Sequence, residues 1–383
     1  MKNKTLCLLA AGISMLAFSH TAMAYETKAK NAILMDFETG TYLFVKNHQE
    51  KIAPASMSKL MTVYVLLKKV KDGEISLEDT FTVSEKAWRK GGAASGGSTM
   101  FLKIGQEVSV EDLLKGILIQ SGNDACIVVA ENVAGSEEEF AEMLNETAEK
   151  IGLKNAHFEN STGLPHPDHR ISPEDLAILA RHIIKEFPEY YPIFKQKEFT
   201  FNGIKQGNRN PLLYSLPGAD GLKTGHTDEA GFCLTGSVKR GNRRLIEVVA
   251  GLSSNKERSE ESEELMTWGF ANFDNFTFFN QNQIMATVPV WYGALPTVDL
   301  VVPEKVVKTI KKSKKNKYSA KISYATPVKA PIAKGDQLGE IHIIYDGAIK
   351  EKIPLVAKED VAKVNFISRF FANLKYFIFG TGK

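Results

Sequence analysis

Cysteine is scarce in this chain, with three residues in 383. So low a number excludes a disulfide-stapled scaffold. Cys126 and Cys233 each lie inside an apolar run, which predicts two small buried side chains and no bridge. Long apolar segments are also missing at the N-terminus: the run from Leu6 to Phe18 has 13 residues, and a membrane-spanning helix needs about 20.

The overall composition is that of a soluble globular protein. Hydrophobic residues make up 43% of the chain, charged residues 24% and aromatic residues 9%. These values exclude disordered, collagen-like and coiled-coil chains. The length allows two domains, each large enough to bury a core.

The N-terminus has the pattern of a signal peptide. Lys2 and Lys4 precede the apolar run, and the small-residue sequence Ala22-Met23-Ala24 follows it. Signal peptidases cleave after such a sequence. We therefore expect residues 1–24 to be removed and the mature chain to be exported from a bacterial cell.

Charge is unevenly divided along the chain. Residues 25–275 carry 29 basic and 37 acidic side chains, residues 276–360 carry 13 and 8, and residues 361–383 carry 4 and none. A basic end on an exported protein indicates an anionic lipid surface or cell-wall polymer as partner, and it makes nucleic acid an unlikely one.

Residues 25–275 predict a mixed α and β domain with strands at both ends and helices in the middle. Ser172-Pro173-Glu174 combines an N-cap hydroxyl, a proline at the first helical position and an acidic first turn. The expected helices are 57–70, 109–119, 137–151 and one from 172, and the expected strands are 32–35, 42–45, 231–238 and 244–252.

Residues 276–360 predict a small all-β sandwich, because short β runs alternate there with proline, glycine and lysine turns. The expected strands are 284–290, 297–302, 306–309, 318–324, 337–345 and 352–356.

Residues 361–383 predict an amphipathic helix. At 100° per residue, seven apolar side chains fall in one sector of about 140°, opposite Arg369 and Lys375. Such a helix is suited to lie in a membrane interface; docking on the protein's own surface is the alternative. The seven are Phe366, Ile367, Phe370, Phe371, Leu374, Phe377 and Ile378.

The first candidate for chemistry is Ser56-Met57-Ser58-Lys59. Residues three apart share one face of a helix, so Lys59 can reach the Ser56 hydroxyl and take its proton. Burial among apolar neighbours lowers a lysine pKa toward that of a usable base. A chain of this length also holds about one or two such spacings by chance.

Two further motifs follow. Ser121-Gly122-Asn123 places a hydroxyl and a carboxamide in a small-residue turn, although Ser253-Ser254-Asn255 has the same spacing. Lys223-Thr224-Gly225 offers an ammonium and a hydroxyl to a carboxylate, beside a glycine that lets a substrate lie close to a sheet edge.

Taken together and in this order, the motifs at 56, 121 and 223 resemble the signature of penicillin-binding proteins and serine β-lactamases. The whole chain resembles the low-molecular-mass penicillin-binding proteins that act as D-alanyl-D-alanine carboxypeptidases. The resemblance implies an α+β catalytic domain, with a helical cluster on an antiparallel sheet, over 25–275. It also implies an all-β domain over 276–360 and an anchoring helix over 361–383, attached peripherally to the periplasmic face of the inner membrane.

The resemblance also implies roles for residues of this chain. Ser56 would attack the bond between two D-alanines of a peptidoglycan pentapeptide and form an acyl-enzyme, with Lys59 as its base. Ser121 would carry the proton to the leaving amine. The same serine would be acylated by β-lactams.

Further residues would bind the substrate. Asn123 and Gly225 would hold the peptide chain, Lys223 and Thr224 would recognise its terminal carboxylate, and the backbone N–H groups of Ser56 and His226 would form the oxyanion hole. Arg258 and Arg209 occupy the places of arginines that approach the carboxylate in this family; ordinary surface guanidinium groups are the alternative.

Two other features carry no assigned chemistry. The glycine-rich segment 90–98 indicates a mobile rim of the active site. His157, His166 and His169 lie close together in the sequence without a metal-ligand spacing, so we expect hydrogen-bonded structural roles, no metal and no cofactor.

Two other functions remain open at this stage. A class A β-lactamase would carry a Glu-x-x-Leu-Asn pattern to activate water, and residues 150–180 contain none. The other alternative is a non-enzymatic module that binds the cell wall or the membrane.

Overall fold

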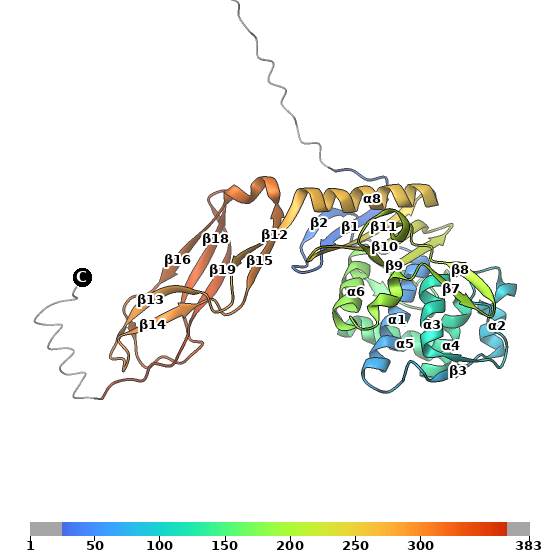
Figure 1. The fold of residues 1–383 in the computed structure, drawn as a ribbon, viewed down its shortest axis with the longest axis horizontal. Helices are drawn as coiled ribbons and strands as arrows, with labels where there is room; N and C mark the ends of the chain where they lie inside the picture. Colours follow the sequence, from blue (N-terminus) through green and yellow to red (C-terminus); the bar gives the residue numbers. More distant parts are fainter. Residues whose placement is uncertain (1–24, 366–383) are drawn as a thin grey trace, which may run out of the picture.

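The computed structural model describes residues 25–365 as an elongated molecule with two regions, a mixed α and β region and an all-β region (Figure 1). The expected signal peptide and residues 366–383 of the expected terminal helix lie outside the described residues. The helix prediction is wrong for residues 361–365, because Val361 and Lys363 form β-bridges with Ile332 and Gly293. Among the described helices, none is long and apolar enough to cross a membrane.

A five-stranded antiparallel sheet forms the centre of the first region, with strand order β2-β1-β11-β10-β9. A turn at residues 36–40 joins the first two strands, and Gly40 has the positive φ of 72° that this turn requires. The strands are β1 (Asn31–Asp36), β2 (Tyr42–Lys46), β9 (Ala219–Thr227), β10 (Gly231–Arg240) and β11 (Arg243–Leu252).

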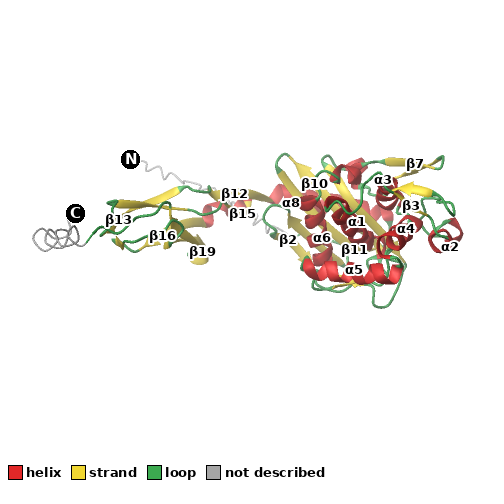
Figure 2. Ribbon diagram, turned by 90° about the horizontal axis from the view of Figure 1, so that it is seen from below, coloured by secondary structure: helices red, strands yellow, loops and turns green. Residues whose placement is uncertain are grey.

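Both faces of this sheet are buried. Ile33 and Met35 belong to the core on the side of the helical cluster, whereas Ala32 and Leu34 belong to the core under α8 (Asn255–Asn272). Successive side chains of β1 point to opposite faces of the sheet, so this strand contributes residues to both cores. Figures 1 and 2 show α8 on one face, with the cluster on the other. The cluster comprises α1 (Lys59–Lys71), α4 (Asn123–Ala134), α5 (Glu137–Lys150) and α6 (Pro173–Glu186).

Hydroxyl caps set several helix starts where the sequence predicts them. The side chains of Ser109, Ser136 and Ser172 each accept a hydrogen bond from the backbone N–H three residues on. The predicted helix 109–119 is divided into α3 (Val110–Lys115) and a π-helix, η3 (Gly116–Gln120), which ends at Ser121. A single helical period does not reveal this change of winding.

Shorter elements complete the first region. They are η1 (Ala55–Ser58), β3 (Thr80–Thr82), α2 (Glu85–Gly91), η2 (Ala93–Ser95), β4 (Glu107–Ser109), β5 (Ala156–His157), β6 (Arg170–Ile171), η4 (Tyr191–Lys195), β7 (Glu198–Phe201), β8 (Ile204–Gly207) and α7 (Leu212–Ser215).

The second region is all-β, as the sequence predicts, with a six-stranded sheet of order β16-β18-β19-β14-β13-β17 and a two-stranded sheet of β12 and β15. Its elements are β12 (Phe273–Phe279), β13 (Ile284–Trp291), β14 (Thr297–Val301), β15 (Val306–Lys311), η5 (Lys312–Lys317), β16 (Tyr318–Tyr324), β17 (Val328–Lys329), β18 (Gln337–Tyr345) and β19 (Ala348–Ala357).

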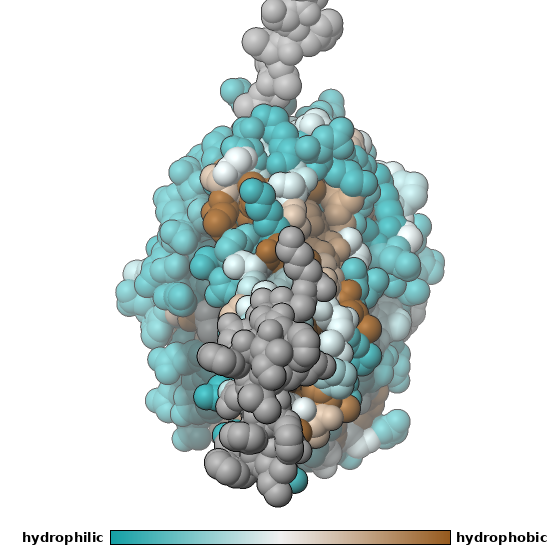
Figure 3. Space-filling view, turned by 90° about the vertical axis from the view of Figure 1, so that its left-hand side faces the viewer, coloured by the Kyte–Doolittle hydropathy of each residue, from teal (hydrophilic) through white to brown (hydrophobic). Residues whose placement is uncertain are grey.

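Helix α8 runs directly into β12, so the expected boundary between residues 275 and 276 falls inside one strand. Polar contacts join the two regions there: Arg243 donates to the backbone oxygen of Phe273, and Asn275 donates to Asp36 at 3.1 Å. Seen from the free end of the all-β region, the surface is mostly hydrophilic, with separate hydrophobic patches (Figure 3).

Candidate active site

The three sequence motifs meet at one end of the helical cluster, beside the edge strand of the sheet. Ser56 lies in η1 just before α1, Ser121 lies between η3 and α4, and Lys223 lies on β9. Gly225 permits this meeting, because a Cβ there would come within 2.9 Å of the Pro54 carbonyl oxygen. The glycine therefore lets β9 pack against η1, in addition to lining the cleft.

Lys59 is fully buried and points back at Ser56. Its Nζ donates hydrogen bonds to Ser56 Oγ at 2.9 Å, Asn123 Oδ1 at 2.8 Å and the Thr162 backbone oxygen at 2.6 Å. The last two oxygens can only accept, so they hold two of the amine hydrogens. The remaining position on Nζ, which is a lone pair when the amine is uncharged, therefore faces the Ser56 hydroxyl. This hydroxyl can donate a hydrogen bond as well as accept one.

Burial is the main reason that the pKa of Lys59 is lowered to about 8; Cys126 and Asp124 act against it, and the charge of Arg209 acts with it. Near neutral pH a useful fraction of this amine is then uncharged. An uncharged amine that faces a hydroxyl at hydrogen-bond distance can take its proton, so the geometry suits nucleophilic catalysis by Ser56.

A second buried lysine, Lys223, is hydrogen-bonded to the serine of the second motif, Ser121. Lys223 donates from Nζ to Ser121 Oγ at 3.0 Å and to the Thr224 backbone oxygen at 3.0 Å. Burial, followed by the charge of Lys59, lowers the Lys223 pKa well below its usual value. Ser121 itself has a φ of 61°, a left-handed conformation rare for serine, which turns its hydroxyl into the cleft.

Asp124 holds the residues that follow the glycine-rich segment 90–98. This buried carboxylate accepts hydrogen bonds from the Thr99 hydroxyl at 2.6 Å and from the backbone N–H groups of Met100 and Leu102. The Asn123 N–H donates to the Ser98 backbone oxygen at 2.8 Å. These contacts hold the end of the glycine-rich segment against the active site.

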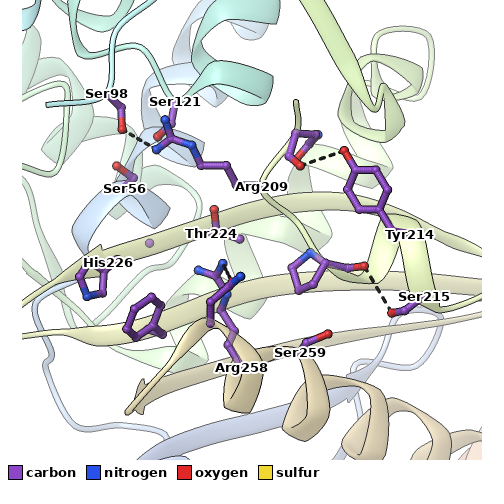
Figure 4. A pocket seen from close by; sticks show the side chains of 15 residues that line it. Ser56, Ser98, Ser121, Arg209, Tyr214, Ser215, Thr224, His226, Arg258 and Ser259 are labelled. Carbon is purple, nitrogen blue, oxygen red and sulfur yellow. Dashed lines mark hydrogen bonds between the residues drawn. The ribbon is translucent and has the colours of Figure 1, made fainter. Parts of the chain in front are cut away.

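These residues open into a cleft of about 730 Å³ (Figure 4). Of the described residues that line it, none is acidic, whereas two are arginines. The two arginines give the cleft an excess of positive charge that suits an anionic group. Its lining comprises Ser56, Ser98, Ser121, Asn208, Arg209, Pro211, Tyr214, Ser215, Thr224, Gly225, His226, Phe232, Asn255, Arg258 and Ser259.

Both predicted arginines face this cleft. Arg258, on α8, donates to Asn255 Oδ1 and to the Cys233 backbone oxygen, and its buried Nε has no partner among the described residues. Arg209 reaches across the mouth of the cleft to Ser98 Oγ at 2.5 Å (Figure 4). His226 lines the cleft and its ring lies 4.0 Å from that of Phe232.

The structure also contains site residues that the sequence analysis missed. Ser98 comes from the segment expected to add only mobility, and the Thr162 carbonyl comes from a loop 103 residues beyond Lys59. Asn255 belongs to the Ser253-Ser254-Asn255 repeat of the second motif, where it positions Arg258. A backbone carbonyl leaves no sequence signal, and the spacing of Ser253-Ser254-Asn255 was interpreted as a chance repeat of the second motif.

The expected structural roles of the cysteines and of His169 are confirmed. Cys126 and Cys233 are buried and unbridged. His169 Nδ1 accepts from the Glu159 backbone N–H at 3.1 Å, so the opposite nitrogen donates to Ser58 Oγ at 2.6 Å. Burial lowers the pKa of His169 to about 4, and this histidine is therefore neutral.

Comparison with known families gives two matches. The family described as D-alanyl-D-alanine carboxypeptidase, peptidase S11, matches residues 18–254. The family described as the C-terminal domain of penicillin-binding protein 5 matches residues 273–363.

Individual relatives resemble the chain over almost its full length. D-alanyl-D-alanine carboxypeptidase DacC of Escherichia coli is 41% identical over 372 residues, covering 94% of this chain and 93% of the relative. DacF of Bacillus subtilis is 37% identical over 381 residues, covering 96% of each. The crystal structure of penicillin-binding protein 5 from Haemophilus influenzae has a TM-score of 0.80 at 37% identity, covering 89% of this chain and 99% of that one.

Proposed function

The chain belongs to the D-alanyl-D-alanine carboxypeptidase family, and on that premise we propose that Ser56 is the nucleophile with which it removes the terminal D-alanine from peptidoglycan stem pentapeptides. The observation that carries this assignment is the buried Lys59 Nζ, 2.9 Å from Ser56 Oγ, with its other hydrogens held by two acceptors.

Acylation follows from that geometry. Lys59 takes the hydroxyl proton while Ser56 Oγ bonds to the carbonyl carbon between the two D-alanines. The backbone N–H groups of Ser56 and His226 stabilise the resulting oxyanion. Ser121, which is hydrogen-bonded to Lys223, passes its proton to the departing amine and takes up the proton that Lys59 gained, so that both side chains return to their starting states. The C–N bond breaks, free D-alanine leaves, and water later hydrolyses the acyl-enzyme to release the shortened peptide and restore the hydroxyl.

Positive charge selects a peptide with a free carboxylate. Lys223 and Thr224 lie beside the catalytic serines, and Arg258 and Arg209 face the same cleft. Asn123 and Gly225 hold the peptide backbone. Charge-assisted hydrogen bonds to a carboxylate are about twice as strong as neutral ones, so removal of the last residue is favoured over internal cleavage.

Labelling with a fluorescent penicillin tests the nucleophile. The wild-type protein should form a covalent adduct with slow deacylation, and Ser56→Ala should form none. Ser253→Ala removes the first serine of the other Ser-x-Asn sequence and should label like wild type. Label retained in Ser56→Ala would refute the assignment, and fast turnover of benzylpenicillin would favour a β-lactamase.

We also propose export and peripheral attachment to the periplasmic face of the inner membrane. The support is the cleavable pattern of residues 1–24 and the amphipathic pattern of the chain end. We divide the mature chain into a catalytic domain over 25–275, an all-β domain over 276–360 and an anchor over 361–383.

Truncation tests the anchor. Val361 is buried and forms a β-bridge with Ile332, so a cut after residue 365 leaves the all-β region complete. The protein lacking 366–383 should leave the membrane fraction and still cleave a small peptide that ends in D-Ala-D-Ala. Retention on the membrane would place the anchor elsewhere.

A further inference from the structure

The loop between β5 and β6 carries two His-x-carboxylate pairs outside the catalytic cleft. His157 is followed by Glu159 on the outgoing arm, and His166 by Asp168 on the returning arm. The arms are held together because β5 and β6 pair antiparallel, with His157 opposite Arg170. The sequence analysis found no metal-ligand spacing among the three histidines. In the structure, His157 and His166 lie near a carboxylate, whereas His169 faces Ser58.

Three side chains bring ligand atoms together, and a fourth, His157, contacts one of them. Glu159 Oε1 lies 2.9 Å from His157 Nε2, and Glu159 Oε2 lies 3.9 Å from His166 Nδ1. One ligand-type atom from each of Glu159, His166 and Asp168 lies within 4.8 Å of the others. Zinc bonds to nitrogen and oxygen are about 2.0–2.2 Å long, so atoms on one ion lie at most about 4.4 Å apart and binding would draw these side chains slightly together.

The charges around this cluster suit a cation. Within residues 25–365, neither Glu159 nor Asp168 forms an ion pair with lysine or arginine. Two carboxylates thus lie close together without a lysine or arginine partner among the described residues.

We propose that Glu159, His166 and Asp168 form a binding site for a divalent transition metal ion, with zinc as the best fit, and that His157 orients Glu159. One imidazole and two carboxylates, with a fourth position left for water, suit zinc, whereas calcium and magnesium prefer oxygen ligands alone. His157 and His166 have side chains 51% and 44% exposed, so the ion can enter from solvent.

Bound metal would cross-link the two arms of the loop that touches the catalytic lysine. Between the arms, the Ser161 carbonyl accepts from Thr62 at 2.7 Å and the Thr162 carbonyl accepts from Lys59. The ion would therefore stiffen the support of Lys59 without entering the catalytic cleft.

Calorimetric titration of zinc chloride into the chelator-treated full chain, made without a histidine tag, tests the site. We expect one equivalent to bind, and cobalt(II) to give visible absorption bands of a nitrogen and oxygen site that excess calcium does not remove. His166→Ala and Glu159→Gln should each weaken zinc binding at least about tenfold. Unchanged penicillin acylation in both variants shows that they are folded.

His342→Ala is the matched control. His342 lies 3.1 Å from Glu340 on β18, a similar His–carboxylate pair without the second pair. This variant should bind zinc like wild type. The proposal fails if wild type binds no zinc, if His166→Ala and Glu159→Gln retain full affinity, or if His342→Ala removes the bound equivalent. None of these outcomes depends on the identity of the nucleophile.

Discussion

Lysine occurs in both regions of the molecule in opposite surroundings. In the catalytic region, Lys59 is 0% and Lys223 2% exposed, and burial lowers both pKa values. In the all-β region, the lysines of 311–317 are exposed. There a hydrogen bond to Asp346 raises the pKa of Lys317.

The difference explains why one residue type serves two purposes. An exposed lysine keeps its proton and meets anionic surfaces as a point charge. A buried lysine without a carboxylate partner loses part of its affinity for the proton and becomes a base. Fold position, and not residue type, decides which of the two a lysine becomes, and variants of both regions can test this.

The largest effect is expected from the substitution Lys59→Met, and the same substitution of an exposed lysine in the all-β region is its control. Lys59→Met removes the amine but keeps an apolar chain of similar length, so the rate of penicillin acylation should fall by about 10²- to 10⁴-fold. Lys315→Met should leave it unchanged, because Lys315 only covers the ring of Phe276 at 4.6 Å. Stopped-flow or mass-spectrometric acylation measures both. Equal rates in the two variants would remove Lys59 from the mechanism.

The pH profile should show the second-largest effect. The active form of Lys59 is uncharged and its pKa is about 8, so the acylation rate should rise about tenfold per pH unit below 8 and level off above it. The folded pKa lies below that of a free lysine, so activity is lost as pH falls through 8. A midpoint near that of free lysine would show that Lys59 is not desolvated as the structure describes.

A third effect concerns the substrate carboxylate. Arg258→Ala should raise KM for a peptide ending in D-Ala-D-Ala by about 10- to 100-fold, because a charged hydrogen bond contributes about 1.5–3 kcal/mol. The same peptide with a C-terminal amide should be affected little. Arg89→Ala is the control, since the Arg89 side chain is 68% exposed and its ion pair within residues 25–365 is with Glu85. Equal losses for acid and amide peptides would mean that Arg258 supports the fold and does not bind the carboxylate.

Much of this organisation could be predicted from the sequence, because its signals are local. Alternating strands, serine caps and the spacing of Ser56 and Lys59 depend on neighbours within one turn or one hairpin. The fold class, the family and the carboxypeptidase activity that these motifs indicated are confirmed by the comparisons.

The contacts that the sequence did not reveal join distant segments. The Thr162 carbonyl on Lys59, Ser98 on Arg209 and Asn255 on Arg258 depend on tertiary packing or on a backbone atom. Strand β12 was not among the expected strands for a related reason: α8 passes directly into it, without a turn residue that would mark its start.

The smallest effect is expected from substituting one glycine in each region. Gly163 and Gly335 both have positive φ, 76° and 93°. A Cβ on Gly163 would lie 2.1 Å from the Ala55 carbonyl oxygen, whereas a Cβ on Gly335 would have no described atom within 4 Å. Gly335→Ala should lower the free energy of unfolding by about 1 kcal/mol, from backbone strain alone. Gly163→Ala should lose about 1–3 kcal/mol more through overpacking.

Denaturant unfolding measures this pair, and acylation of the folded fraction separates stability from chemistry. The Gly163 loop supplies the Thr162 carbonyl that holds Lys59, so Gly163→Ala should also slow acylation in protein that is still folded. Gly335→Ala should acylate at the wild-type rate. If both variants lose stability equally and acylate normally, the close approach of this loop to η1 does not position the catalytic lysine, and burial alone must account for its lowered pKa.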